Sequence, residues 1–225
     1  MTCQPIFVVP KPGSSKFRLI NDHSAGECSL NSLIPLEGGF VKLDTLQDLG
    51  ANIQAQIALR SRQKPCYLFK SDMSQAYRCL PMHPQWQARQ GSEIDGFYHV
   101  DHNAVFGNHA SGWIWCLLLD CILWVAIHDH SLTDLLAYID DTFGYEYDPV
   151  LDFYEPYNHY MPKKQATLLR IWDQIGLPHE DHKQVFGHTL EIIGLKVSLS
   201  TMTITLADKR RSDLVKAVCE FISPA

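Results

Sequence analysis

Two adjacent carboxylates, Asp140 and Asp141, stand between two short apolar runs in "LLAYIDDTFGYE", residues 135–146. A third, Asp72, ends the mostly apolar run "CYLFKSD". If these runs are neighbouring strands, the three side chains meet at one edge of a sheet, where their like charges need cations to neutralise them. Hard carboxylate oxygens suit Mg²⁺, with Mn²⁺ as a substitute. The pattern predicts a site for two metal ions; the alternative is an ordinary solvated turn, which Asp also favours.

The two neighbouring aspartates cannot play the same part. Successive side chains of a strand point to opposite faces, so Asp140 and Asp141 cannot both aim squarely into one site. We expect Asp140 to be the main bridging ligand and Asp141 to be more peripheral.

The elements that must position these carboxylates alternate between hairpins and helices. Strands are predicted for "PIFVVPK" and "KFRLIND", for residues 66–72, for a hairpin with Asp95-Gly96 as its turn, for the 135–146 hairpin and for two or three short strands in 188–206. Helices are predicted at 44–62, 111–128, around 162–176 and at 207–222. This order favours an α+β fold with an antiparallel sheet.

Composition and charge limit the function classes. The 225 residues, 46% hydrophobic and 20% charged, fit one large folded domain or two or three subdomains. The net charge of −6 argues mildly against a nucleic-acid partner, yet basic residues cluster at 11–18, 60–64, 163–164 and 209–211. Because screening limits each charge to about 8–10 Å, the local clusters carry more weight.

The longest apolar run, "WIWCLLLDCILWVAI" at 113–127, is too short and too interrupted by Asp120 to span a bilayer, so a buried core helix is expected. The seven cysteines make no CxxC pair and no signal peptide precedes them, which favours a reducing intracellular compartment.

Five segments, in order, resemble the palm motifs of reverse transcriptases: "SDMSQAYRCLPMHP", "FGNHASGWIW", "YIDD", "IGLPHEDHKQVFG" and "IIGLKVS". The first hairpin, "PIFVVPKPGSSKFRLINDHS", resembles the fingers of the same enzymes. The resemblance covers nearly the whole chain and is closest to eukaryotic retroelement polymerases. It implies a right-hand fold, with fingers at 1–65 and 80–105, palm at 66–79 and 106–206, and the start of a thumb at 207–225. The antiparallel palm sheet would have helices packed on one face.

The resemblance also implies roles for single residues. Asp72, Asp140 and Asp141 would hold two Mg²⁺ ions, and Lys183 would be a general acid beside the leaving pyrophosphate. The residues that would bind the nucleotide are Lys11 and Arg18 at the triphosphate, Gln75 and Ala76 along the triphosphate and sugar, Tyr77 as the gate against a ribose 2′-OH, and Phe106 and Gly107 near the templating pair. Ile193, Gly194 and Leu195 would form the primer grip, and Lys209, Arg210 and Arg211 would touch backbone phosphates.

The activity implied is that of an RNA-directed DNA polymerase of a retrotransposon, acting on a primed RNA or DNA template with dNTPs. It would be intracellular, with no membrane partner, and ribonuclease H or integrase segments could belong to a larger polyprotein. Two departures support an inactive or domesticated fragment that only binds nucleic acid or a protein: Ser111-Gly112 replaces an expected Ala-Pro or Ser-Pro, and the chain stops one helix into the thumb. A third departure is the aromatic segment 145–164, which is unusually long.

Other readings stay open with less support. A viral-type RNA-dependent RNA polymerase conflicts with Tyr77, because such an enzyme must accommodate a ribose 2′-OH. The pair His128 and His130 could suggest zinc, but no matching Cys/His spacing accompanies it. The aromatic residues of 143–160 could stack on single-stranded bases, although packing against the palm is the favoured interpretation.

Overall fold

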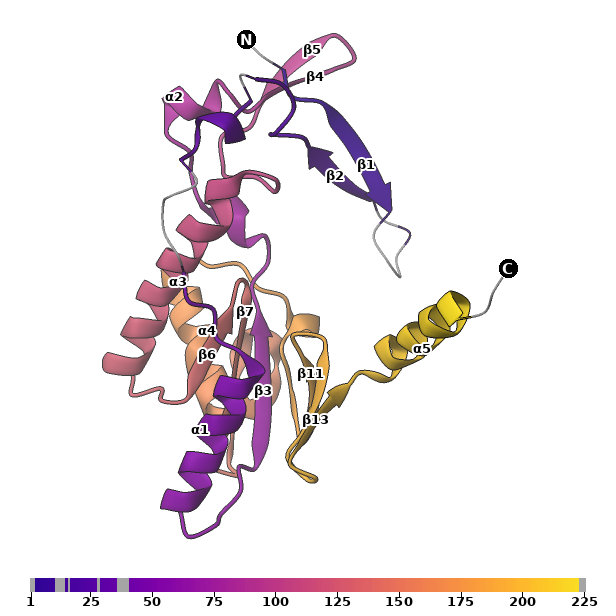
Figure 1. Cartoon of the computed structure of the whole chain (residues 1–225). Coiled ribbons are helices and arrows are strands. Elements are labelled where there is room, and N and C mark those ends of the chain that lie inside the picture. Colours follow the sequence, from indigo (N-terminus) through magenta and orange to yellow (C-terminus); the bar gives the residue numbers. More distant parts are fainter. Residues whose placement is uncertain (1–2, 11–14, 16, 28, 36–40, 223–225) are drawn as a thin grey trace. The chain divides into compact units, whose positions relative to one another are not determined.

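The computed structural model describes residues 3–10, 15, 17–27, 29–35 and 41–222 (Figure 1). The chain divides into two compact units, the first made of Met1–Lys42 and Gln75–Ile122 and the second of Leu43–Ser74 and Leu123–Ala225. Helices and antiparallel strand pairs mix throughout, which confirms the predicted α+β class. The division into fingers, palm and thumb stays a prediction.

The second unit is built on a four-stranded antiparallel sheet with the strand order β10-β3-β7-β6. Its strands are β3 (Tyr67–Asp72), β6 (Leu135–Tyr138), β7 (Asp141–Glu146) and β10 (Val185–Gly187). The register places Asp72 opposite Asp141, and Tyr138 faces Asp141 from the other side. The prediction that the strands carrying the carboxylates are neighbours is therefore confirmed.

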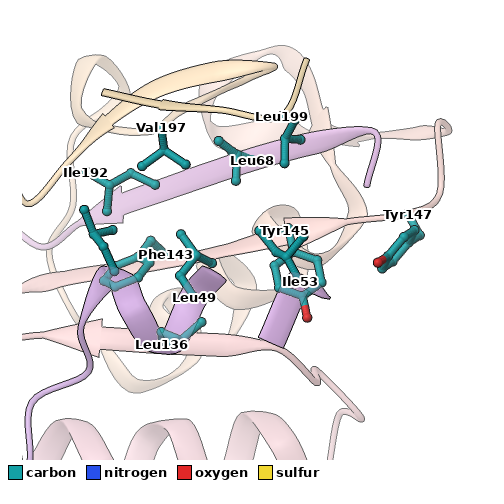
Figure 2. Close-up of a cluster of buried hydrophobic side chains, with 11 residues drawn as sticks. Leu49, Ile53, Leu68, Leu136, Phe143, Tyr145, Tyr147, Ile192, Val197 and Leu199 are labelled. Atoms are coloured by element: carbon teal, nitrogen blue, oxygen red, sulfur yellow. The ribbon is translucent and has the colours of Figure 1, made fainter. Parts of the chain in front are cut away.

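Helix α1 (Leu46–Leu59) packs on one face of this sheet through Leu46, Leu49 and Ile53, the positions that helical periodicity indicated. A capping box between Thr45 and Asp48 begins the helix. Figure 2 shows Leu49 and Ile53 with Leu136, Phe143 and Tyr145 from the sheet, and Leu68 beside Val197 and Leu199. This cluster is the main core of the second unit.

Helix α4 (Lys163–Ile175) contacts the sheet's other face, which corrects the prediction that helices pack on one face only. The fully buried Gln165 donates from Nε2 to the Ser71 hydroxyl and to the Lys70 carbonyl. Ser71 alternates with Leu68 and Asp72 along β3, so its side chain lies on the face opposite to α1. Gly176, with φ of 73°, ends α4 as the sequence predicted.

The remaining elements of the second unit are two small sheets, a short turn of helix and the last helix. A hairpin of β8 (Leu151–Tyr154) and β9 (His159–Pro162), joined by η3 (Glu155–Tyr157), packs against α4. The short helix η4 (Asp181–Lys183) precedes β10. A three-stranded sheet of β11 (Thr189–Ile192), β12 (Leu195–Ser198) and β13 (Thr203–Leu206) leads into α5 (Asp208–Ile222), whose residues are all exposed.

The first unit contains two hairpins and short helices. They are β1 (Ile6–Pro10) with β2 (Phe17–Asn21), β4 (Gly91–Ile94) with β5 (Phe97–Val100), η1 (Asn31–Leu33), η2 (Ala76–Cys79) and α2 (Pro84–Gln87). The buried Asn31 donates to the Gly107 carbonyl and accepts from the His109 backbone N–H. It therefore ties η1 to the segment that follows Phe106.

Helix α3 (His109–His128) differs from the buried core helix that the sequence predicted. Trp115, Leu119 and Ala126 are buried, but Trp113, Leu117 and Trp124 are exposed. By length and composition alone α3 could cross a membrane, a test that core helices of soluble proteins also pass. The helix begins at His109, two residues before the predicted start at 111, and ends at His128 as predicted.

Candidate active site

Three aspartates lie at the edge where β3 ends and β7 begins. Asp72 is the last residue of β3, and Asp141, the first of β7, is its direct partner in the antiparallel register. Asp140 occupies the turn between β6 and β7 together with Ile139. The turn is tight, and Ile139 adopts a φ of 58°, which is unusual for a β-branched residue. Asp140 is exposed, whereas Asp72 and Asp141 are half-buried.

Two lysines pair with two of these carboxylates. The Lys183 ammonium lies 3.0 Å from Asp72 Oδ1, although the two residues are 111 positions apart in the chain. The Lys70 ammonium lies 3.0 Å from Asp141 Oδ2. Lys183 was singled out from the sequence, but Lys70 was missed. Its signal was available, because Lys70 stands two residues before Asp72 and therefore points to the same face of β3.

The electrostatics of the cluster disfavour full ionisation. The pKa of Asp140 is raised, first by desolvation and then by the charges of Asp141 and Asp72, against a backbone hydrogen bond and Lys183. The pKa of Asp141 is raised by desolvation and by Asp72, although Lys70 and Lys183 oppose the shift. The two lysines thus leave part of the negative charge uncompensated, which favours binding of further cations.

The donor set fits Mg²⁺ or Mn²⁺ in its chemistry, because three carboxylates offer hard oxygen ligands at one sheet edge. The side chains as they stand do not yet enclose an ion. Within the described ranges, no group of three His, Cys, Asp or Glu side chains gathers closely enough to hold one. Lys70 and Lys183 instead occupy one oxygen each of Asp141 and Asp72.

The loop that carries Lys183 is bound to the backbone around Asp72. Gln184 donates from Nε2 to the Asp72 carbonyl and to the Glu180 carbonyl. The Ser74 hydroxyl donates to Glu180 Oε1 over 2.7 Å, and the Ser74 N–H donates to the Pro178 carbonyl. Asp72 is therefore held on both its side chain and its main chain by the segment 178–184.

The predicted nucleotide-binding residues belong to the first unit. Lys11 lies outside the described residues, and Arg18 lies in β2, opposite Val9. Gln75 is exposed with φ of 57°, and Ala76 is buried at the start of η2.

Tyr77 packs its ring edge-on against the exposed Phe106, with ring centroids 5.0 Å apart. Gly107 follows with φ of 92°, and a Cβ there would lie 2.9 Å from the Asn21 carbonyl, so only glycine fits. The structure therefore brings Tyr77 against Phe106, and it places Gly107 against the Asn21 carbonyl.

The predicted primer grip is a second tight turn, between β11 and β12. Ile193 and Gly194 occupy it with φ of 49° and 72°, and Leu195 begins β12. A Cβ on Gly194 would lie 2.2 Å from Cζ of Arg210, so the Arg210 guanidinium of α5 lies directly over this glycine.

Solved structures of known proteins share this fold. A foamy viral protease-reverse transcriptase in complex with an RNA/DNA hybrid matches with a TM-score of 0.68 at 16% identity, over 99% of this chain and 25% of that one. The same kind of protein in complex with dsDNA matches with a TM-score of 0.70 at 17% identity, over 99% of this chain and 39% of that one. The chain has a reverse-transcriptase-like fold. No family model and no curated protein matches the sequence.

The reverse-transcriptase-like fold agrees with the resemblance of the sequence motifs. At 16% and 17% identity, the similarity to these solved structures shows the fold alone. The chain spans between a quarter and two fifths of the length of these solved proteins. Asp72, Asp140, Asp141 and Lys183 are brought together within the second unit. The roles assigned to them and to the nucleotide-binding residues stay predictions.

Proposed function

We propose that this chain is the polymerase part of an RNA-directed DNA polymerase of a retrotransposon. One observation carries the proposal: Asp72 faces Asp141 across the β3–β7 register, with Asp140 at the adjoining turn, in a reverse-transcriptase-like fold. Three carboxylates and a lysine at one sheet edge suit nucleotidyl transfer better than any structural role, because their mutual repulsion costs stability.

In the proposed reaction a primer 3′-OH attacks the α-phosphate of a dNTP. Asp72, Asp140 and Asp141 would hold two Mg²⁺ ions, which supply activation of the hydroxyl and charge neutralisation at the pyrophosphate. Lys183 Nζ lies 3.0 Å from Asp72 Oδ1 and would deliver a proton to the leaving pyrophosphate. Most of the catalysis would come from positioning and preorganised charge.

The proposed substrates are a primed template and dNTPs. The solved proteins of the same fold are complexes with an RNA/DNA hybrid or dsDNA, which supports a primed template as the partner here. Tyr77, braced by Phe106, would exclude a ribose 2′-OH and so select dNTPs. This selection argues against an RNA-dependent RNA polymerase. The surroundings remain proposals too: an intracellular compartment, no membrane partner, and ribonuclease H or integrase segments in a larger polyprotein.

Primer extension tests the function directly. With an oligo(dT)-primed poly(rA) template, dTTP and Mg²⁺ or Mn²⁺, the wild type should extend the primer. Asp140→Asn should lower the rate by about a thousandfold, because a ligand of the proposed metal ions is lost. Asp213→Asn, on the exposed helix α5, is the matched control and should extend as the wild type does. Failure of folded wild-type protein with both metals would contradict the proposal.

A second candidate function is favoured by the two lysines. Because Lys70 and Lys183 already offset two of the three carboxylates, the cluster could persist without metal, as in a fragment that only binds nucleic acid or a partner protein. Calorimetric titration with Mn²⁺ in the absence of template separates the two. Binding that Asp140→Asn abolishes supports the polymerase, and no binding by folded wild type supports the idle fragment.

A further inference from the structure

The long aromatic segment 145–164 has a place in the fold that the proposed chemistry does not explain. Tyr145, Tyr147 and Tyr154 are buried, which confirms packing for them, whereas Phe153 and Tyr160 are exposed on the β8–β9 hairpin. The hairpin and η3 place Tyr154 and Tyr157 against α4, with the two rings edge to face. At the centre of this aromatic cluster lies a histidine that comes from a different segment, His179.

The His179 imidazole has a partner at each ring nitrogen. Its Nε2 lies 3.1 Å from Asp173 Oδ1 on α4, and its Nδ1 is hydrogen-bonded to the Tyr157 hydroxyl. The Tyr154 hydroxyl donates to the other oxygen of Asp173 over 2.6 Å. The rings of Tyr154, Tyr157 and Trp172 surround the imidazole, whose side chain is only 5% exposed.

The Tyr157 hydroxyl can act as the donor in this chain of hydrogen bonds. Desolvation, followed by the charges of Asp181, Asp173 and Glu180, raises the pKa of Tyr157 to about 12, so the hydroxyl keeps its proton. Tyr157 can then donate to Nδ1 of His179, and Nε2–H donates to Asp173. Every polar atom of the imidazole is satisfied, and a buried group of this kind resists displacement.

The backbone of His179 reaches the candidate active site. His179 forms an isolated antiparallel bridge with Met73, the residue immediately after Asp72. On either side of it, the Pro178 carbonyl accepts from the Ser74 N–H and the Glu180 carboxylate accepts from the Ser74 hydroxyl. The imidazole therefore fixes the start of the loop that runs along the end of β3.

From His179 the loop continues to the groups that contact Asp72. Backbone bonds from Lys183 to Glu180 and from Gln184 to Asp181 close η4. Lys183 then forms an ion pair with the Asp72 carboxylate, and Gln184 donates to the Asp72 carbonyl. The side chains of the Lys183–Asp72 ion pair are 29% and 26% exposed, and partly exposed pairs contribute little to holding a loop. The hydrogen bonds of the His179 imidazole, which is only 5% exposed although Asp173 is 43% exposed, are a further anchor of the loop.

We infer that Tyr157, His179 and Asp173 form a positioning triad that holds the loop 178–184, and with it Lys183, against Asp72. The triad acts through Lys183 and touches no substrate. The inference rests on the proposed function for its catalytic consequence, but the anchoring of the loop stands on the contacts themselves. It also gives the β8–β9 hairpin a purpose, because η3 of this hairpin supplies Tyr157.

The triad makes a specific kinetic prediction. Loosening the loop moves Lys183 away from Asp72 without altering Tyr77, Phe106 or the other residues proposed to bind the nucleotide. The chemical step should therefore slow while nucleotide binding persists, since a small displacement of a reacting group is costly. A purely structural role would instead reduce the amount of folded protein and leave kcat per folded molecule unchanged.

Tyr157→Phe is the test variant, because it removes only the hydroxyl that binds His179. Tyr160→Phe, which removes a hydroxyl from the exposed outer side of the same hairpin, is its matched control. Amide hydrogen exchange is measured first, without template, metal or nucleotide. Exchange of residues 178–184 and of the Ser74 N–H should accelerate by about tenfold in Tyr157→Phe and stay at the wild-type rate in Tyr160→Phe.

Primer extension is measured second. In Tyr157→Phe, kcat should fall by about tenfold with the dNTP KM within about threefold of wild type. His179→Leu should lose at least as much, and His179→Gln, which keeps an amide donor for Asp173, should recover part of the loss. Because Tyr157→Phe changes one atom, it remains decisive even if His179→Leu fails to fold.

The outcomes separate this inference from the proposed function. Loop exchange and kcat equal to those of Tyr160→Phe would overturn the triad, and so would faster exchange with unchanged kcat in an active enzyme. If the wild type extends no primer, the proposed function fails, but the exchange measurement still decides the anchoring. Faster exchange confined to 178–184 and Ser74 then supports the triad, and unchanged exchange overturns it.

Discussion

Two hairpins of the second unit end in turns of the same length, each with an isoleucine in the left-handed region. Tyr138-Ile139-Asp140-Asp141 joins β6 to β7, and Ile192-Ile193-Gly194-Leu195 joins β11 to β12. The φ angles of Ile139 and Ile193 are 58° and 49°, a conformation that costs a β-branched residue about 1–3 kcal/mol. After the isoleucine the turns differ, because one continues with a carboxylate and the other with a glycine.

The two turns share a backbone conformation but carry different charges. In the first turn Asp140 places a charge next to Asp72 and Asp141, where desolvation and then repulsion raise its pKa. In the second turn Gly194 leaves room for the Arg210 guanidinium. One turn gathers negative charge that suits metal ions, and the other lies beneath a positive charge that suits a nucleic-acid backbone. Strain is retained in both turns, as is common at functional sites.

The largest difference between the two turns should appear when the kinetics of Gly194→Ala are compared with those of Asp140→Asn. The added Cβ must displace Arg210, and φ of 72° strains any residue with a Cβ. We expect the KM for primer to rise by about tenfold with kcat nearly unchanged, and the salt dependence of binding to weaken by about one phosphate contact. Steady-state extension at several salt concentrations measures both.

Gly50→Ala in α1 is the control, because a Cβ there meets nothing within 4 Å. A fall in kcat with unchanged primer KM would show that Gly194 affects the chemical step and not primer binding. The two turns would then not differ in role.

The two isoleucines should respond oppositely to asparagine, which tolerates the left-handed region. Ile139→Asn relieves strain and should raise the free energy of unfolding by about 1 kcal/mol. Ile193→Asn relieves similar strain but removes a side chain packed against the core cluster, so it should lower the free energy of unfolding by about 1 kcal/mol. Urea titrations of both variants test this, and equal shifts of the same sign would show that strain dominates at both turns.

The smallest effect concerns the charge at the first turn without metal. Folding raises the pKa of Asp140, so the protonated carboxyl favours the folded state. This contribution to stability is complete below about pH 4 and is lost as the pH rises through the folded-state pKa. Near neutral pH, Asp140→Asn should therefore stabilise the metal-free protein, by about 0.5 kcal/mol after allowance for solvent screening. The difference should vanish in acid.

Saturating Mg²⁺ should stabilise the wild type and not Asp140→Asn, which reverses their order. Thermal unfolding with and without the metal checks the reversal. A variant less stable than wild type in metal-free buffer near neutral pH would show that the turn carries no excess charge.

Much of the fold was predictable because its signals are local. Leu46, Leu49 and Ile53 mark the buried face of α1 by their spacing, and Gly176 marks the end of α4. Asp95-Gly96 indicated the β4–β5 turn in the same way. Such patterns act within a few residues, so they hold whatever the rest of the chain does.

The predictions that the structure corrected share a physical cause. The exposed face of α3 was not foreseen, since an apolar run reads alike whether or not a neighbour covers it. Helices on both faces of the sheet were missed as well, because Gln165 looks like a surface residue until Ser71 and the Lys70 carbonyl satisfy it. Burial of a polar side chain depends on partners that are distant in the chain.

The sequence by itself determined the residue types that can do chemistry and the strand ends at which they stand: Asp72, Asp140 and Asp141, because strand alternation and turn residues are local properties. Only the tertiary structure decided what surrounds them. It paired Lys70 with Asp141, brought Lys183 to Asp72 across 111 residues, and set His179 between Tyr157 and Asp173. These contacts join segments from separate elements, and their energies exist only once the sheet, α4 and the β8–β9 hairpin have packed together.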